Sequence, residues 1–314
     1  TYYGACSDIE AIARVCHDWG VPLLVDQAWG PHFPFHGSLP PHALSVGADM
    51  VVTGCHKLLG AFTQASMLHV RGRLVDPGHV DVVRRLLETT SPSCLLYASL
   101  DVARMQMATE GELALQEAIE LAEEARFRLG SHPLLRCLDK TLVGSYGVAA
   151  LDPTRLCVDV SRTGHTGYQV ERMLRAEGVV VEMSDFTNVL ANITIAHRWD
   201  QVDALVQGLV AIAEDATGPP PGRGGAGAVL PAQPEAAMSP AEAFHAPQQR
   251  IPLGDAAGRV AAELAASYPP GIPVVGPGER LTRPLVDYLA AQVRAGCRMV
   301  GPEDPTLGTI NVVR

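Results

Sequence analysis

The sequence predicts an α/β fold in which helices cover a mostly parallel sheet. Short apolar runs at residues 21–25, 50–53 and 67–70 are bounded by Gly or Pro, as expected for buried parallel strands. Stretches with apolar residues at helical spacing, beginning with residues 7–19, alternate with these runs. The length of 314 residues and the hydrophobic content of 47% are sufficient for a full core and for two or three domains.

The first predicted helix, residues 7–19, has capping signals at both ends. Ser7 is its expected N-cap, with Glu10 three residues later in a capping box, and Gly20 ends it. The other elements of the N-terminal part are, in order, the strand at 21–25, a loop to residue 41, a short helix at 41–46, the strands at 50–53 and 67–70, and helices at 79–88, from 94 and at 113–129.

The C-terminal part continues the alternation. Strands are expected at 156–160, 179–183, 189–195 and 310–313, and helices at 167–177, 200–213, 255–266 and 281–295. Residues 217–249 are dominated by Pro, Gly and Ala, which cannot bury a core, so this segment is predicted to be a flexible linker. The predicted domains are therefore residues 1–141, 142–216 and 250–314.

One carboxylate and one amine follow neighbouring predicted strands. Asp26 comes directly after the first strand, and His56 and Lys57 come shortly after the second. In open α/β sheets, ligands bind in the crevice outside the carboxyl ends of the strands. These side chains are therefore expected to meet at one ligand site, although either charged residue alone would suit a helix cap or an exposed surface.

An amine and a carboxylate at such a site suit pyridoxal phosphate. A lysine amine forms a Schiff base with the aldehyde of this cofactor, and a carboxylate pairs with the protonated ring nitrogen and keeps the ring an electron sink. Lys57 and Asp26 are the candidates for these roles. Ala28 follows Asp26 by two residues, so it can point to the same side and lie flat against the ring. Trp29 is expected either to shape the pocket wall or to pack within its own loop.

The order of these motifs resembles the fold-type I pyridoxal phosphate enzymes, and within them the bacterial ornithine/lysine/arginine decarboxylase family. The segments that carry the resemblance are Asp26-Gln-Ala-Trp29, His56-Lys57, Gln64-Ala-Ser66, residues 89–93, Tyr268-Pro-Pro-Gly-Ile-Pro273, Pro277-Gly-Glu279 and Asp304-Pro-Thr-Leu307. The Asp and His-Lys pair is common to many such enzymes, whereas the segment that begins at Tyr268 is more specific to the decarboxylases.

The resemblance implies a partial fold-type I large domain, a small α/β domain and a C-terminal α+β domain. It also implies decarboxylation of arginine, lysine or ornithine to a polyamine precursor, by a cytoplasmic homodimer or larger homo-oligomer. Lys57, His56 and Asp26 would be catalytic, and Lys57 or His56 would return a proton to the substrate. Residues Asp26, Ala28, Trp29, His56, Lys57, Thr90 and Ser91 would contact the cofactor. Thr90 and Ser91 would reach the phosphate held by the neighbouring subunit, although their hydroxyls also suit an ordinary helix cap.

Two departures from the family pattern leave alternatives open. Gly54 stands where the family usually has a Ser that contacts phosphate, so only a backbone amide remains there. The chain starts at Thr1 in what reads as the middle of a domain, and the family's phosphate-binding Ser/Thr loop and ring-stacking His are not expected within it. The alternatives are another fold-type I enzyme, such as an aminotransferase, or a truncated fragment without catalysis.

Composition argues against several other classes. The formal net charge of -10 disfavours nucleic acid and anionic membranes as partners, and no stretch approaches the ~20 apolar residues of a membrane helix. The seven scattered cysteines contain no C-x-x-C pair and suit the reduced thiols of a cytosol. His32, His36 and His42 are separated by prolines and have no acidic neighbours, so no metal site is expected.

Two acidic residues of the small domain are the remaining candidates for a site. Glu182 and Asp185 lie at a predicted hairpin, where they could face a cationic substrate. A solvated turn is the alternative interpretation of both residues.

Overall fold

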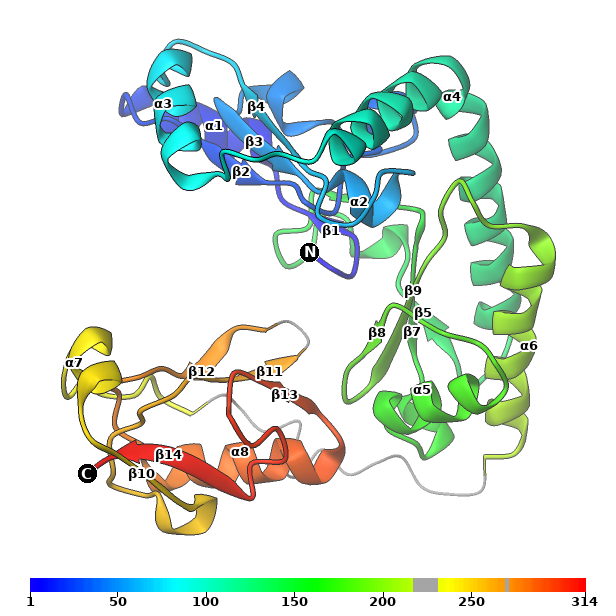
Figure 1. Cartoon of the computed structure of the whole chain (residues 1–314). Coiled ribbons are helices and arrows are strands. Elements are labelled where there is room, and N and C mark those ends of the chain that lie inside the picture. Colours follow the sequence, from blue (N-terminus) through cyan, green and yellow to red (C-terminus); the bar gives the residue numbers. More distant parts are fainter. Residues whose placement is uncertain (217–230, 269–270) are drawn as a thin grey trace. The chain divides into compact units, whose positions relative to one another are not determined.

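The computed structural model describes residues 1–216, 231–268 and 271–314, and the chain divides into two compact units (Figure 1). The first unit comprises Thr1–Arg128, Cys137–Leu156 and Asn192–Val206. The second comprises Leu129–Arg136, Cys157–Ala191 and Gln207–Arg314. Helices and sheets occur in both, as the predicted α/β class requires.

The first unit contains the elements nearest the predicted site. Its strands and helices are β1 (Ala5–Cys6), α1 (Ile9–Asp18), β2 (Leu24–Asp26), β3 (Met50–Thr53), α2 (Cys55–Leu58), β4 (Met67–Val70), α3 (Pro77–Leu87) and β6 (Ala150–Leu151). Short 3-10 helices occupy Phe33–Phe35, Ala43–Val46 and Lys140–Leu142. Elements with residues in both units are α4 (Cys94–Gly130), β5 (Arg136–Cys137), β7 (Arg155–Asp159), β9 (Asn188–Asn192) and α6 (Trp199–Glu214).

The second unit holds the remaining elements. These are α5 (Gly167–Ala176), β8 (Met183–Ser184), α7 (Pro240–His245), β10 (Gln248–Pro252), β11 (Ala265–Tyr268), β12 (Pro273–Val275), α8 (Arg283–Ala295), β13 (Arg298–Val300) and β14 (Thr309–Val313), with 3-10 turns at Ser161–Thr163 and Leu253–Asp255. The sheets have the strand orders β2-β3-β4, β1-β6, β5-β7-β9-β8, β12-β11-β13 and β10-β14.

The sheet β2-β3-β4 combines both strand directions. β2 and β3 are parallel, with Asp26 opposite Val52, whereas β4 runs antiparallel to β3, with Met67 opposite Thr53. The expectation of a third parallel strand at residues 67–70 is therefore wrong. A parallel return needs a crossover of a dozen or more residues that carries the chain back along the sheet, and the segment between β3 and β4 holds only the one-turn helix α2.

Helix α1 packs against the core of this sheet at its first residue. Ile9 packs against a cluster that includes the buried residues Ala43 and Val51. The N-cap of α1 is Asp8 and not Ser7, because the Asp8 carboxylate accepts a hydrogen bond from the backbone N–H of Ala11 at 2.9 Å. A carboxylate at this position also interacts favourably with the helix dipole.

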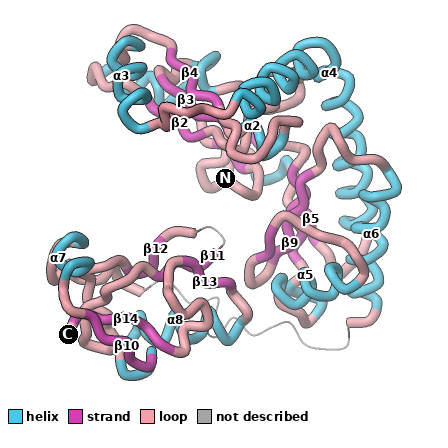
Figure 2. The backbone as a smooth tube through the Cα atoms, in the orientation of Figure 1, coloured by secondary structure: helices cyan, strands magenta, loops and turns pink. Residues whose placement is uncertain are grey.

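The C-terminal part of the second unit contains one sequence-based error. The helix expected at 255–266 does not form, and that segment runs from the 3-10 turn at Leu253–Asp255 into strand β11 (Figure 2). Gly258 has a φ of +86°, and the N–H groups of Gly258 and Ala261 donate to the carbonyls of Leu281 and Glu279. Hydrogen bonds to distant segments therefore replace the i to i−4 bonds of a helix.

Two other predicted elements of this part agree with the structure. The helix expected at 281–295 is α8 and the strand at 310–313 is β14, and their buried faces form one core that includes Leu285, Leu289 and Ile310. Of the predicted linker, residues 231–249 include α7 and the start of β10, and residues 217–230 lie outside the described residues. The division into three domains stays a prediction.

Helix α5 starts against the turn that joins β8 to β9. The N–H of Gly167, the first residue of α5, donates to the carbonyl of Phe186 at 3.1 Å. A Cβ at position 167 would overlap the carbonyl oxygens of Asp185 and Asn188. This turn can therefore approach the helix only because residue 167 has no side chain.

We predict that Gly167→Ala lowers the free energy of unfolding by about 2 kcal/mol or more, because overpacking against backbone atoms forces the turn to move. Gly130→Ala is the matched control, since a Cβ there meets no atom within 4 Å. Urea denaturation of both variants is the measurement. Equal effects of the two substitutions would contradict the packing argument.

Candidate active site

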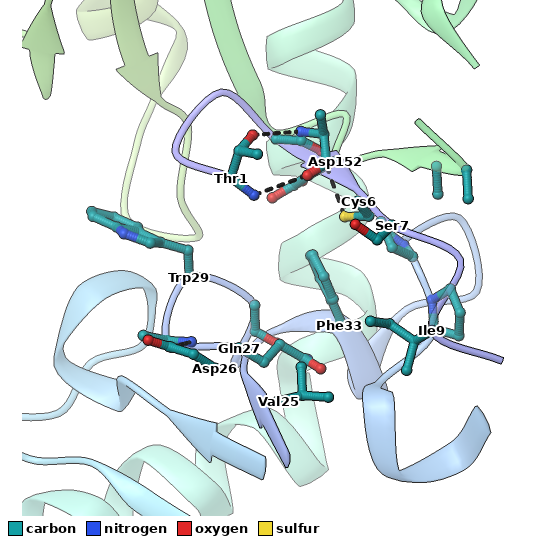
Figure 3. Close-up of a pocket in the computed structure, with 18 of the residues that line it drawn as sticks. Thr1, Cys6, Ser7, Ile9, Val25, Asp26, Gln27, Trp29, Phe33 and Asp152 are labelled. Atoms are coloured by element: carbon teal, nitrogen blue, oxygen red, sulfur yellow. Dashed lines mark hydrogen bonds between the residues drawn. The ribbon is translucent and has the colours of Figure 1, made fainter. Parts of the chain in front are cut away.

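A cavity of about 520 Å³ lies within the first unit, and Figure 3 shows Asp26, Trp29 and Asp152 around it. Three parts of the chain form most of its wall. They are the N-terminal segment 1–10, the loop 25–30 that follows β2, and a group of separate side chains that includes Lys57, Asp152 and Arg155. The carboxylate and the amine predicted to meet at the sheet edge therefore line the same cavity.

Strand pairing explains this meeting. Asp26 is the last residue of β2, and Lys57 follows the end of β3 by four residues, within α2. Because β2 and β3 are parallel neighbours, both side chains emerge at the carboxyl edge of the sheet. The Asp26 carboxylate is exposed and accepts a hydrogen bond from the N–H of Ala28 at 2.9 Å. An exposed carboxylate, a lysine amine and the small side chain of Ala28 suit the ring and aldehyde of pyridoxal phosphate.

Gly54 brings two strand-end loops together. Its N–H donates to the carbonyl oxygen of Ala28 at 3.2 Å. A Cβ at position 54 would lie 2.9 Å from the same oxygen and 3.1 Å from Cδ of Lys57. The absence of a side chain therefore permits the close approach, and the backbone amide, which the sequence left as the one phosphate donor here, is already used within the chain.

The Trp29 indole contacts two cations. Lys57 Nζ lies 4.4 Å from the indole centroid, and Arg155 Cζ lies 4.6 Å from the same centroid. The Tyr2 ring is also adjacent, with 5.2 Å between centroids. Trp29 thus forms a wall of the pocket, as one of the two sequence-based alternatives proposed.

Arg155 and Asp152 are site residues that the sequence analysis missed. Their side chains are almost completely buried and form an ion pair, with Nε of Arg155 3.3 Å from Oδ2 of Asp152. His32, also buried, donates from Nε2 to the same carboxylate at 3.2 Å. The Asp-Pro-Thr sequence before β7 signals a turn, which forms as the N–H and hydroxyl of Thr154 donate to Asp152, but no local signal indicates the buried charges.

Burial and hydrogen bonding set the ionisation of two groups that line the pocket. Burial alone raises the pKa of Asp152, but the hydrogen bond and charge of His32, with Arg155 and Thr154, outweigh burial and lower this pKa to about 2. Burial raises the pKa of the Cys6 thiol to about 11. Asp152 is therefore an anion at neutral pH, and Cys6 is a protonated thiol that makes a poor nucleophile.

His56 binds the backbone of a neighbouring loop and does not line this cavity. Its backbone N–H and its Nδ1 both bind the carbonyl oxygen of Ala65, at 3.1 and 2.9 Å, so Nδ1 is a donor. His56 is not among the residues that line the cavity. The neighbouring Cys55 is buried, and burial raises the pKa of its thiol, as expected for a packing residue. The proton-transfer role of His56 stays a prediction.

Four other predicted site residues lie outside the cavity. Thr90 and Ser91 are exposed in the segment between α3 and α4, where the N–H of Ser91 donates to the Thr89 hydroxyl at 3.1 Å. Glu182 and Asp185 belong to the second unit, and Asp185 accepts hydrogen bonds from the N–H groups of the turn that follows it. Asp185 therefore organises its own turn, and the substrate role of both acids stays a prediction.

The three histidines of the loop after β2 have separate partners. His32 binds Asp152, His36 Nε2 lies 3.0 Å from Oε1 of Gln116, and His42 stacks edge-on against His69. Within residues 1–216, 231–268 and 271–314, no three His, Cys, Asp or Glu side chains are grouped to hold a metal ion.

Family models and known proteins match almost the whole chain. The model for "Orn/Lys/Arg decarboxylase, major domain" matches residues 1–201, and that for "Orn/Lys/Arg decarboxylase, C-terminal domain" matches residues 226–311. Arginine decarboxylase of Bacillus subtilis (strain 168) is 40% identical over 315 residues, and that of Bacillus anthracis is 38% identical over 319. Each alignment covers 100% of this chain and 64% of the relative, so the chain spans about two-thirds of these proteins.

Solved structures agree on the fold. The constitutive lysine decarboxylase of E. coli superposes with a TM-score of 0.78 at 20% identity, over 100% of this chain and 57% of that one. Lysine decarboxylase A from Pseudomonas aeruginosa gives 0.78 at 22% identity, over 100% and 56%. Ureidoglycine-glyoxylate aminotransferase from Bacillus subtilis gives 0.52 at 17% identity, over 70% and 59%. The predicted fold class is confirmed.

We predict that Asp152 makes the fold acid-sensitive. Its folded-state pKa of about 2 lies below the ordinary 3.8, so ionised Asp152 stabilises the fold above pH about 4, and this stabilisation is lost as pH falls towards 2. The shift corresponds to roughly 2 kcal/mol. Urea denaturation between pH 5 and pH 2 should show the stability gap between wild type and Asp152→Asn narrowing by that amount.

The exposed carboxylate of Asp101, paired with Arg104 on α4, is the control. The free energy of unfolding of Asp101→Asn should change with pH nearly as that of wild type does, because exposed ion pairs contribute little to stability. A constant gap for Asp152→Asn would mean that its carboxylate is not the stabilising anion.

Proposed function

This chain belongs to the Orn/Lys/Arg decarboxylase family, and from that premise we propose that it acts in the pyridoxal phosphate-dependent decarboxylation of a basic amino acid. The observation that carries the proposal is the placement of Asp26 and Lys57 in one cavity at the carboxyl ends of two parallel strands. The family match favours decarboxylation, and Asp26 and Lys57 provide the carboxylate and the amine that this reaction requires.

Each residue has a definite task in the proposed site. When bound, the cofactor supplies a protonated ring that accepts the electron pair released as carbon dioxide leaves. Asp26 would hold the proton on the ring nitrogen through its negative charge. The amine of Lys57 would hold the cofactor aldehyde and would later deliver a proton to the substrate carbon. Ala28 would pack on the ring, and Trp29 would close the side of the pocket next to Lys57.

Arginine is the first substrate to test. The curated relatives that match at about 40% identity are named arginine decarboxylases, and the product would be the corresponding amine, a polyamine precursor. Lysine and ornithine share a distal positive charge and belong in the same panel. Glu182 and Asp185 remain the proposed contacts for that charge.

We also propose that a second copy of the chain completes the site. The only backbone amide that Gly54 offers is bonded to Ala28, so phosphate donors must come from elsewhere. Thr90 and Ser91 are exposed between two helices whose neighbouring apolar side chains are also exposed, including Leu87 at 82% and Leu95 at 71%. Such a patch marks an interface, and a partner that covers it would meet the two hydroxyls.

We also propose a cellular location and a domain division for this chain. All seven cysteines are free, which supports a cytoplasmic location. Among the residues that the structure describes, no helix combines the length and the hydropathy of a membrane span. The proposed domains are a large domain to residue 141, a small domain from 142 to 216 and a C-terminal domain from 250.

We predict that cofactor attachment occurs at Lys57 alone. The chain contains one other lysine, Lys140, which is exposed and paired with Glu123 at 3.6 Å. After incubation with pyridoxal phosphate and borohydride reduction, peptide mass spectrometry should find the label on Lys57. Lys57→Ala should lose the label and the release of carbon dioxide from arginine, lysine and ornithine, whereas Lys140→Ala should keep both.

A label confined to Lys140, or activity that survives Lys57→Ala, would refute the assignment. A specific label on Lys57 with no carbon dioxide from any of the three amino acids would leave a cofactor-binding protein and refute the decarboxylase. Formation of a keto acid in place of carbon dioxide would favour an aminotransferase.

We predict that the exposed apolar patch forms the subunit interface. Leu87→Glu combined with Leu95→Glu should shift sedimentation from dimer or larger species towards monomer, because two charges would have to be buried in the interface. Cofactor retention should fall at the same time, since assembly and cofactor binding stabilise each other by mass action. Val180→Glu, at an apolar position of the second unit that is 67% exposed, is the control. An assembled double variant would show that this patch is not the interface.

A further inference from the structure

The buried side chain of Arg155 connects two segments that line the pocket. Its side chain packs against Gly4, where a Cβ would lie 2.8 Å from Cγ of Arg155. Its guanidinium then donates to the carbonyl oxygen of Trp29 at 2.9 Å and to Oδ1 of Asn192. With only 1% of the side chain exposed, the whole length of Arg155 is fixed by its surroundings.

Burial of the Arg155 guanidinium carries a desolvation penalty, which nearby polar groups offset. A buried guanidinium requires a nearby anion, and Asp152 supplies it at 3.3 Å. Asp152 is in turn held by His32 and Thr154. A buried ion pair adds little stability compared with apolar packing, so its presence beside a pocket points to a role in geometry.

The geometry concerns Trp29. The same guanidinium binds the Trp29 backbone carbonyl and lies over the indole, 4.6 Å from its centroid. Both the position of the loop and the tilt of the ring therefore depend on Arg155. The ammonium of Lys57 lies 4.4 Å from that indole centroid. Contacts of this kind contribute about 0.5–2 kcal/mol, which is sufficient to select one orientation of a side chain.

We propose that Arg155 is a positioning residue that fixes the Trp29 indole, and that Trp29 in turn holds the Lys57 amine in the pocket ready to meet a carbonyl. Asp152 acts as the buried counter-charge that keeps the guanidinium in place, and His32 holds the Asp152 carboxylate. The part of this proposal that concerns the carbonyl rests on the proposed function, whereas the part that concerns Trp29 does not.

Direct binding of a substrate carboxylate by Arg155 is a weaker interpretation. The guanidinium already contacts a carboxylate, an amide oxygen and a backbone carbonyl. A substrate anion would have to compete with Asp152 for the guanidinium. The positioning role uses the contacts that are present.

The test isolates the signal of Trp29. The chain has three tryptophans, so Trp19→Phe with Trp199→Phe leaves Trp29 alone. Arg155→Lys keeps the charge but loses the planar fork that reaches Trp29, Asn192 and Asp152 together. Without cofactor, acrylamide should quench Trp29 fluorescence more strongly in Arg155→Lys, and fluorescence anisotropy should fall. The rate of covalent attachment of pyridoxal phosphate to Lys57 should fall about fivefold, the factor that corresponds to one lost contact of this strength.

Arg128→Lys is the matched control. Arg128 pairs with Asp203 at 2.7 Å and lies over the ring at position 199, 5.3 Å from the Trp199 centroid. It therefore also combines a carboxylate and an aromatic partner in the same unit, but it is more exposed than Arg155 and lines no part of the cavity. It should leave Trp29 quenching and the attachment rate unchanged. If Arg155→Lys does not fold, Arg155→Met with Asp152→Asn replaces the pair by neutral groups of similar size.

Folded Arg155 variants with wild-type quenching of Trp29 would overturn the proposal. So would equal effects from Arg128→Lys, or failure of both Arg155 variants to fold, which would make the pair purely structural. Increased quenching in a protein that attaches no cofactor even as wild type would support the Trp29 role while refuting the proposed function.

Discussion

The parallel pairing of β2 with β3 is the constraint on which the candidate site depends. It places the ends of two strands at one edge of the sheet, and each end carries one charged residue into the same cavity. Asp26 and Lys57 are 31 positions apart in sequence, and no local interaction could bring them together. A slip of one residue in either strand would turn the side chains to opposite faces. The chemistry of the pocket is therefore a consequence of strand register.

Close approach at Gly54 shapes the site as strongly as any charged group. The turn after β3 lies against the loop after β2 because residue 54 has no Cβ. This contact uses the Gly54 N–H, so that amide is not available to bind a cofactor phosphate. The exposed hydroxyls of Thr90 and Ser91 then gain importance, because they lie beside apolar surface that a second copy could cover. In the proposed function, the absence of a side chain at position 54 makes cofactor binding depend on assembly.

Buried charge gives the pocket wall its rigidity. Arg155 and Asp152 lie three residues apart, His32 comes from a distant part of the first unit, and the Asp152 carboxylate contacts both of the others away from solvent. The low pKa of Asp152 shows that the anion is stabilised by its partners in spite of burial. Trp29 is held by this group on one side and contacts Lys57 on the other. The ion pair thereby links the fold of the first unit to the position of the reactive amine.

The sequence by itself determined the α/β class, the family, and the residue types of the charged pair that lines the cavity, since strand-like runs, caps and short motifs are local patterns. It also indicated α8 and β14, but from apolar residues at helical spacing it predicted a helix at 255–266, where hydrogen bonds to distant segments decide the structure. The direction of β4, the engagement of the Gly54 amide and the Arg155–Asp152–His32 group were decided by the tertiary structure alone. Each depends on groups far apart in the chain, whose proximity is fixed only when the sheet and its loops have packed.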